Sequence, residues 1–365
     1  MASTNDRRNP GNRNGWRRLG VFWIAVVSLM AAGGGVVEWL GPPGKQTRAA
    51  HGVPRVNLAG HAQETPLVRV VARPAGSAVV IAGRDTPGPL ADPDPSLLEP
   101  AGDGLTGQLP RIGPGGRTPM QIYAAGFDHG SRRPRVGVLL AGIGLNESES
   151  EAAIRALPGA VSLAVSPYAR NLTRLLTMAR TLGHEYLIAL PLEPVGFPLN
   201  DPGPETLLTS APAATNARNL RWALSRIEGY VGATGVIGTM RGERLAAMTD
   251  QMEAVLIELS GRGLLYIDPR EAIGPVAKTW GRHVELVVDE PAERDAIDAK
   301  LAELEQQAKD RGSALGLVMR PAPVAVARIA AWATGLADRG LALAPVSALV
   351  VAPADAQMKL SEREK

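Results

Sequence analysis

Apolar runs alternate regularly with helical stretches from Pro134 to about Val351. The runs have the length of strands and read VGVLL, VSLAV, YLIAL, TGVIG, LLYID, VELVV, LGLVM and LALAPV. Strands that alternate with helices form a largely parallel sheet covered by helices. Seven or eight such units within roughly 220 residues predict an α/β fold, a distorted β/α barrel of parallel strands. An open doubly wound sheet is the alternative.

Two helical stretches carry an apolar stripe at the spacing of a helix that packs against a core. The stripes are Ile297, Leu301, Leu304, Ala308 in one stretch and Met248, Met252, Val255, Leu259 in the other. We interpret the methionines as core residues. In the first stretch, Pro291 suits the first helical turn and Gly312 suits the C-terminal stop.

Composition limits the function classes. The chain has no cysteine, which excludes disulfides, iron–sulfur clusters and cysteine nucleophiles. The first 18 residues hold five arginines and one aspartate, a net +4, whereas the whole chain is +3. The remaining residues are therefore close to neutral. Since a nucleic-acid binder places its basic patch on the folded domain, we expect no nucleic-acid partner.

An uncharged apolar stretch, Leu19 to Val37, follows the arginine-rich tail. About 20 apolar residues span a bilayer core, and basic flanks stay cytoplasmic. The sequence predicts a cytoplasmic tail over 1–18, a transmembrane signal-anchor helix over 19–40 and a periplasmic remainder, held at a bacterial inner membrane by a single pass. A signal peptide cleaved near Ala31-Ala32-Gly33 is the alternative, although the apolar run continues past these residues.

Prolines and glycines dominate the region between the anchor and the alternating pattern. Such a composition buries too little apolar surface to offset chain entropy, so we predict a long disordered linker over 41–133. Within it, LVRVVA and SAVVIAG could pair as a hairpin. The domain itself is predicted over 134–352, with a polar tail over 353–365.

The first strand ends in a glycine turn, Ala141-Gly142-Ile143-Gly144. A dinucleotide fingerprint would need a third glycine where Glu147 stands, and a P-loop would need a Gly-Lys-Ser/Thr ending. Neither pattern is present. The turn is therefore not a phosphate site.

Other strand ends supply the candidate catalytic residues. Glu193 follows YLIAL, and Asp268 ends LLYID with Arg270 two residues on. Glu193 could be a general acid or base, or could instead cap a turn or pair with an arginine. Asp268 and Arg270 could act in a site, or could form an ion pair that fixes the loop. His184, before YLIAL, is expected to be structural, and Asp289 and Glu290 are expected to cap the following helix.

Metal and triad chemistry lack their usual residues. Of the five histidines, only His184 and His283 fall in the predicted domain, and no His-x-x-His or His-x-x-x-His pair occurs. A Gly-x-Ser-x-Gly nucleophile elbow is absent as well.

The order and spacing of VGVLLAGIG, GHEYLIALPLEP, GATGVIGT, GLLYIDPR and LALAPVSAL resemble the divergent polysaccharide deacetylases. The resemblance extends from about Arg133 to Val351, and GHE, LPLEP, NDPGP and PVSAL are its most specific segments. It implies a distorted β/α barrel, a role in envelope carbohydrate metabolism and a divalent metal such as zinc. Glu193, Asp268 and Arg270 match the family pattern.

The family's expected metal ligands are missing from this sequence. Its pattern ends the first strand in an Asp pair, where Ala141 and Gly142 stand, and has His at the positions of Ala189, Val236 and Arg320. Ala, Gly and Val supply no side-chain ligand, and Arg repels a cation. We therefore expect neither a metal nor another cofactor.

Three functions follow from these observations. The favoured one is a membrane-anchored periplasmic pseudoenzyme that binds an envelope glycan or a periplasmic protein. The alternative is an active carbohydrate amide or ester hydrolase that uses Glu193, Asp268 and Arg270. A structural spacer or interaction module is the third.

Overall fold

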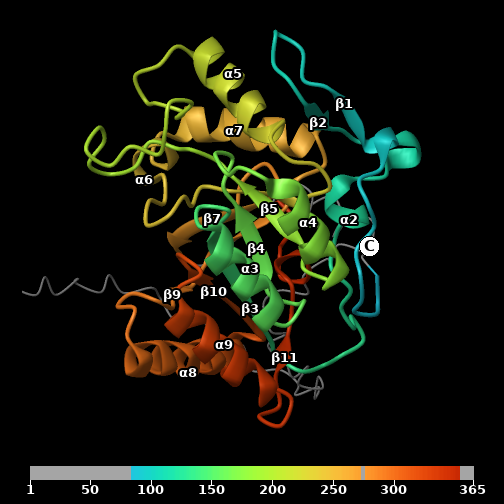
Figure 1. Ribbon diagram of the computed structural model, residues 1–365, viewed down its shortest axis with the longest axis vertical. Coiled ribbons are helices and arrows are strands. Elements are labelled where there is room, and N and C mark those ends of the chain that lie inside the picture. The colour runs from blue at the N-terminus through green and yellow to red at the C-terminus, as the bar shows by residue number, and fades with distance from the viewer. Residues whose placement is uncertain (1–83, 273–275, 354–365) are drawn as a thin grey trace, which may run out of the picture. The chain divides into compact units, whose positions relative to one another are not determined.

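The computed structural model describes residues 84–272 and 276–353, all within one compact unit of the chain (Figure 1). A nine-stranded parallel sheet forms its centre. The strands are β3 (Arg135–Ile143), β4 (Ser162–Val165), β5 (Tyr186–Ala189), β6 (Gly232–Thr234), β7 (Leu265–Glu271), β8 (Gly281–Val284), β9 (Leu286–Val287), β10 (Ser313–Val318) and β11 (Ala342–Leu343).

The sheet curves into a nearly closed barrel. Its strands follow the order β8-β7-β6-β5-β4-β3-β10-β9, and β11 pairs with β3 off this path. The two ends of the order, β8 and β9, are consecutive in the chain, with only Glu285 between them. Because β8 pairs with β7 and β9 pairs with β10, this short segment joins the two edges. This confirms the predicted barrel rather than the alternative, an open doubly wound sheet.

Helices surround the barrel (Figure 1). They are α3 (Glu147–Ala156), α4 (Leu172–Thr181), α5 (Ala213–Leu224), α6 (Glu243–Ala246), α7 (Thr249–Gly261), α8 (Arg294–Arg311) and α9 (Pro323–Thr334). In the view of Figure 1, α3 and α4 lie in front of the sheet, α5 and α7 above it, and α8 and α9 below it.

Both predicted helical stripes contribute to the core. All four residues of the stripe on α8 are buried, and so are three of the four on α7. The exception, Met248, is 47% exposed because it is the N-cap and precedes the helix. The N-cap of α8 is Glu293, so this helix begins later than Pro291, and Gly312 ends it at a φ of +84°.

Aliphatic side chains fill the barrel and form one cluster. Its members include Leu139, Ala141, Ala164, Leu187, Val236, Leu265, Ile267, Val284, Leu315, Leu317 and Met319. The low aromatic content, 4% of the chain, agrees with a core of this kind.

Residues 84–133 are part of the fold, which corrects the predicted linker over its second half. They contain η1 (Pro95–Leu97), β1 (Leu98–Pro100), β2 (Gln108–Pro110), η2 (Pro114–Gly116) and α2 (Pro119–Ile122). Leu97, Leu109 and Tyr123 of this segment are buried. The prediction failed because the segment covers apolar surface of the barrel and needs no core of its own. Three of its prolines, Pro95, Pro114 and Pro119, begin helical turns, a position that proline favours.

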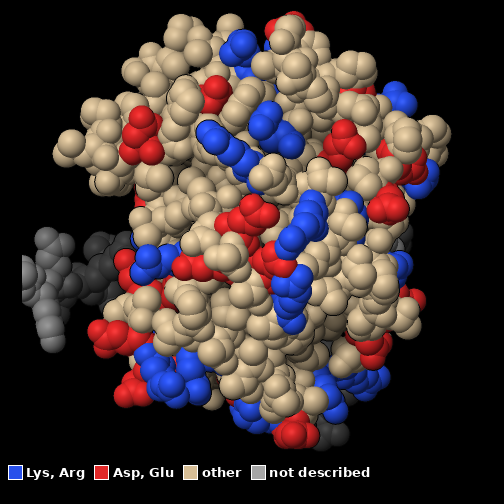
Figure 2. All heavy atoms as spheres, viewed as in Figure 1, with Lys and Arg blue, Asp and Glu red and all other residues tan. Residues whose placement is uncertain are grey.

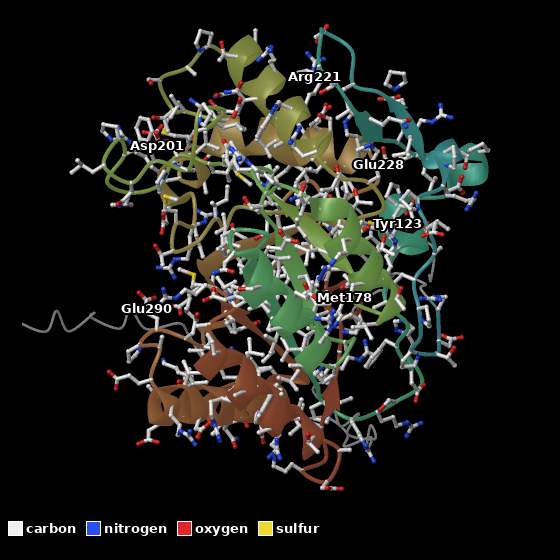
Figure 3. All side chains as sticks on the ribbon, viewed as in Figure 1. Tyr123, Met178, Asp201, Arg221, Glu228 and Glu290 are labelled. Carbon is white, nitrogen blue, oxygen red and sulfur yellow. The ribbon has the colours of Figure 1, made fainter. Side chains whose placement is uncertain are left out.

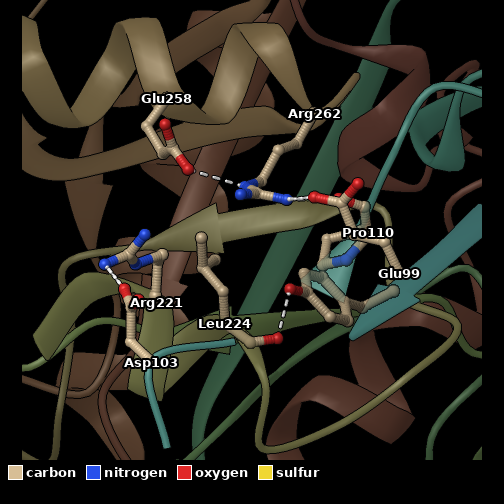
Figure 4. Close-up of polar contacts among 8 residues, drawn as sticks. Glu99, Asp103, Pro110, Arg221, Leu224, Glu258 and Arg262 are labelled. Atoms are coloured by element: carbon tan, nitrogen blue, oxygen red, sulfur yellow. Dashed lines mark hydrogen bonds and ion pairs between the residues drawn. The ribbon is translucent and has the colours of Figure 1, made fainter. Parts of the chain in front are cut away.

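Two arginines of the helical layer hold the β1–β2 hairpin (Figure 4). Arg262 Nη1 lies 2.8 Å from Glu99 Oε1 and donates to Pro110 O at 2.9 Å. Arg221 forms an ion pair with Asp103 in the hairpin turn. The hairpin is thus attached to both α5 and α7.

The predicted anchor over 19–40, the LVRVVA–SAVVIAG hairpin and the tail after residue 353 lie outside the described residues. They stay predictions. No helix within the described ranges is long and apolar enough to cross a membrane.

Acidic and basic side chains are interspersed on the face that Figure 2 shows. This face therefore carries no extended basic surface of the type that binds nucleic acid.

The carboxyl of Glu185 is fully buried at the base of the barrel. Its Oε1 accepts bonds from Ser162 Oγ (2.8 Å) and Ser347 N (3.0 Å), and its Oε2 accepts from Ala125 N (2.8 Å) and Ser347 Oγ (2.5 Å). Burial raises the pKa of Glu185, and these bonds oppose that rise. The carboxyl thereby joins β4, the turn after β11 and the N-terminal segment.

His184 is also fully buried and has a structural role, as expected. Its Nδ1 lies 2.8 Å from Val161 O and its Nε2 lies 3.0 Å from Ile154 O. Burial lowers the pKa of His184, and the two carbonyl contacts oppose that change.

Replacing Glu185 with Gln should lower the free energy of unfolding by about 2–4 kcal/mol, because an amide nitrogen cannot accept the buried donors. Urea unfolding at neutral pH measures the loss. The matched control is Glu290→Gln on the surface (Figure 3), which should change it by less than about 0.5 kcal/mol. Equal stabilities for the two variants would contradict a central role for the carboxyl.

Stability should fall with pH below about 6.5 through His184. Since its folded pKa is lowered, the unfolded chain takes up a proton more readily, and stability is fully present only above the unfolded pKa. For one proton, the free energy of unfolding falls by up to about 1.4 kcal/mol for each unit by which the pH is lowered. Urea unfolding between pH 7.5 and 5 should show a shallower slope for His184→Gln. Parallel pH profiles would contradict the assignment.

Candidate functional site

Buried apolar side chains stand at four carboxyl strand ends, the part of a β/α barrel that usually carries its site. Ala141 near the end of β3, Ala189 at the end of β5, Val236 after β6 and Met319 after β10 are all buried. Three of them belong to the cluster that fills the barrel. The barrel core therefore continues up to its mouth.

Gly142 fits against the neighbouring loop with little space left. Its φ is +77°, which L side chains rarely adopt, and a Cβ there would lie 3.3 Å from Met319 O and Pro321 Cδ. A side chain at position 142 would therefore need a strained backbone and a small shift of residues 319–321. Arg320 itself is exposed.

Asp289 is the buried acid nearest to this loop. Its Oδ1 accepts a bond from Met319 N at 2.9 Å, and burial raises its pKa. It does not cap α8 as predicted, because Glu293 holds the N-cap position. Asp289 instead connects the end of β9 to the end of β10.

Glu193 holds together the long loop after β5. Its carboxyl is 4% exposed, and its Oε1 lies 3.0 Å from Arg244 Nη1. Its Oε2 accepts from Thr209 N at 2.5 Å, and its backbone carbonyl accepts from Arg244 N and Leu245 N. Both carboxyl oxygens are therefore engaged in protein contacts.

Asp268 and Arg270 form an ion pair, which was one of the two interpretations of these residues from the sequence. Arg270 Nη2 lies 2.6 Å from Asp268 Oδ2, and Arg270 Nε lies 3.0 Å from Asp268 Oδ1. The pairing raises the pKa of Arg270. The Asp268 carboxyl is only 3% exposed.

The ion pair has a third neighbour that sequence reasoning missed. His283 Nδ1 lies 3.5 Å from Asp268 Oδ2, because β7 and β8 pair with these two residues in register. Fifteen residues separate them in the chain. No sequence motif signals that register.

Helix α6 separates the candidate residues into two groups. Its first turn bonds to the carbonyl of Glu193, and its last carbonyl, Ala246 O, accepts from Arg270 Nη1 at 3.1 Å. Among the described contacts, none joins the Glu193 carboxyl to Asp268 or Arg270. The structure therefore brings Asp268, Arg270 and His283 into contact, whereas Glu193 contacts α6 and the loop after β5.

Residues 138–350, more than half of the chain, match the family model of the divergent polysaccharide deacetylases. The chain belongs to this family. The match begins within β3 and leaves out the folded segment over 84–133.

One similar solved structure is an uncharacterized protein from Agrobacterium tumefaciens C58. It is 33% identical, with a TM-score of 0.61, and the alignment covers 67% of this chain and all of that one. A family 4 carbohydrate esterase from Streptomyces lividans, in complex with acetate, aligns with 15% identity and a TM-score of 0.38 over 61% of this chain and all of that one. No curated protein matches the chain.

The mouth of this deacetylase-family barrel does not fit the metal that the resemblance implies. Ala141, Gly142, Ala189 and Val236 stand at four of the family's ligand positions, and none has a side-chain donor. Arg320 at a fifth would repel a cation. Among the described residues, no group of three or more metal-binding side chains lies close enough together to hold an ion.

The Asp268–Arg270 pair should behave asymmetrically on substitution. Arg270→Gln leaves a buried carboxylate without its counter-charge and should cost about 3 kcal/mol, whereas Asp268→Asn leaves an arginine that reaches water and should cost about 1–2 kcal/mol. Urea unfolding of both single variants and the double variant measures the coupling. Additive losses would show that the pair contributes nothing as a unit.

Proposed function

We propose that this chain is a membrane-anchored periplasmic member of the family that binds an envelope glycan or a periplasmic protein without hydrolysing an amide. The observation that supports this proposal is the set of buried apolar residues Ala141, Ala189 and Val236 at positions where the family carries metal ligands. Deacetylation by the family's chemistry needs a cation to polarise the carbonyl and to generate hydroxide. This donor set offers a cation no ligand.

The location rests on the N-terminal sequence. An uncharged stretch of membrane-spanning length follows five arginines, and basic flanks stay cytoplasmic. The folded domain would then lie on the far side of the inner membrane, where envelope glycans are.

The alternative is a metal-free hydrolase that uses Glu193, Asp268 and Arg270. A general acid or base must reach the proton that it transfers. The oxygens of Glu193 are engaged by Arg244 and Thr209, and those of Asp268 by Arg270. Both carboxyls are nearly buried, and α6 lies between them, so this arrangement favours a structural role for each.

We expect the full-length chain to bind substoichiometric zinc and to release no acetate from N-acetylglucosamine oligomers, with or without added zinc. The physical reason is the missing donor set. Elemental analysis after dialysis against zinc measures the first quantity, and an acetate assay measures the second.

Two results would contradict the proposal. Stoichiometric zinc with chelator-sensitive acetate release would overturn the pseudoenzyme. Chelator-resistant release that is lost in both Glu193→Gln and Asp268→Asn would establish the metal-free hydrolase.

A further inference from the structure

A groove of about 470 Å³ with a mixed polar and apolar lining lies on the outside of the barrel. Helix α4 forms one wall, the turn between α5 and β6 forms another, and the β1–β2 hairpin forms the third. Its polar lining consists of Thr106, Thr173, Arg180, Ser225, Arg226 and Glu228. Figure 3 labels Glu228, which lies on the side of the barrel that the hairpin covers.

The groove exists because the N-terminal segment is attached to the barrel. Arg221 and Arg262 hold the hairpin through Asp103 and Glu99 (Figure 4). Gly107 then approaches so closely that a Cβ on it would lie 2.5 Å from Ser225 O. This wall precedes residues 138–350, whereas the other two walls lie within them, so the matched region alone does not form the groove.

Arg226 presents unused donors to the groove. Its Nε donates to Pro167 O at 3.1 Å, and its guanidinium lies 5.4 Å from the centre of the Trp222 ring. These two contacts fix the side chain at an exposed position. Its two Nη groups donate to no described residue.

Arg180 adds a second cation that is only weakly compensated. Its side chain is 12% exposed, and its Nε has no hydrogen bond and lies 3.5 Å from Asp92 Oδ1. Asp92 is 91% exposed, so water screens that charge strongly. The other guanidinium nitrogens bond to Tyr186 and Thr177.

The remaining lining offers hydroxyls and an acceptor. The side-chain oxygens of Thr106, Thr173 and Glu228 bond to no described residue, although all three line the groove. A ligand that fits this lining carries an anion for the arginines and hydroxyl donors for Glu228. Inorganic phosphate lacks the several ring hydroxyls that Glu228 and the two threonines would bind, and Glu228 repels its charge.

We propose that this groove binds a saccharide unit that carries a carboxylate, a sugar acid within a longer glycan. Arg226 and Arg180 face the carboxylate, because charge-assisted hydrogen bonds are the strongest that guanidinium donors make. Glu228 accepts from ring hydroxyls, and the two threonines bond to the others. This site is separate from the barrel mouth, so its failure would leave the mouth proposal unaffected.

Calorimetric titration of the full-length chain, held in neutral-lipid nanodiscs, with trigalacturonate tests the site. Maltotriose serves as the uncharged trisaccharide control, and inorganic phosphate serves as the control for a simple anion. We expect saturable binding of trigalacturonate alone, weakened by salt. Arg226→Gln should weaken it about tenfold, the value of one charge-assisted bond. The matched control is Arg218→Gln, an exposed α5 arginine outside the groove, which should leave binding unchanged.

Several outcomes would overturn the assignment. They are equal binding of maltotriose, displacement of trigalacturonate by equimolar phosphate, an unchanged affinity in Arg226→Gln, or an equal loss in Arg218→Gln. Absence of any trigalacturonate binding would overturn it too. Because Arg226 is exposed, thermal unfolding of its variant should match that of the unsubstituted chain, so that lost binding cannot be attributed to lost folding.

Discussion

The buried carboxyl of Glu185 is the interaction on which the barrel base depends. Its four donors come from Ser162 on β4, from Ser347 after β11, and from Ala125 in the N-terminal segment. These parts are far apart in the sequence, so the carboxyl is satisfied only when all of them are in place. A buried carboxyl that lost its donors would be costly, which makes the assembly of the base all-or-none. The adjacent His184 similarly attaches the start of β5 to α3 and the turn that follows it.

This base has a consequence for the other end of the barrel. At the amino end of the barrel, Glu185 and Arg282 bond to the surrounding loops. The carboxyl end is closed by aliphatic side chains and by the approach of Gly142 to Met319. In most β/α barrels the carboxyl end holds the reactive groups, and the amino end serves stability. In this chain the buried charged groups at both ends are engaged in contacts within the protein, among them Glu185, Asp268 and Asp289.

The sequence predicted the barrel because its strands are continuous apolar runs and its helices carry apolar stripes. It also offered the Asp268–Arg270 ion pair as one of two interpretations, because the two residues lie two positions apart at one strand end. It could not predict that the Pro-rich segment folds, since Tyr123 and Leu97 are buried by surface that belongs to the barrel. Nor could it place His283 beside Asp268, because that contact depends on the register of β7 and β8. Contacts within one element follow from spacing, whereas contacts between elements follow from packing.

The same distinction explains why the outer groove was invisible in the sequence. Thr106 and Arg226 carry no motif, and they face one groove only because Asp103 and Glu99 hold the hairpin against the helices. The candidate acids Glu193 and Asp268 form ion pairs, whereas the Nη groups of Arg226 bond to no described residue. Polar groups that folding does not use are the ones available to a ligand. In this chain they lie outside the barrel, on a wall that its own N-terminal segment builds.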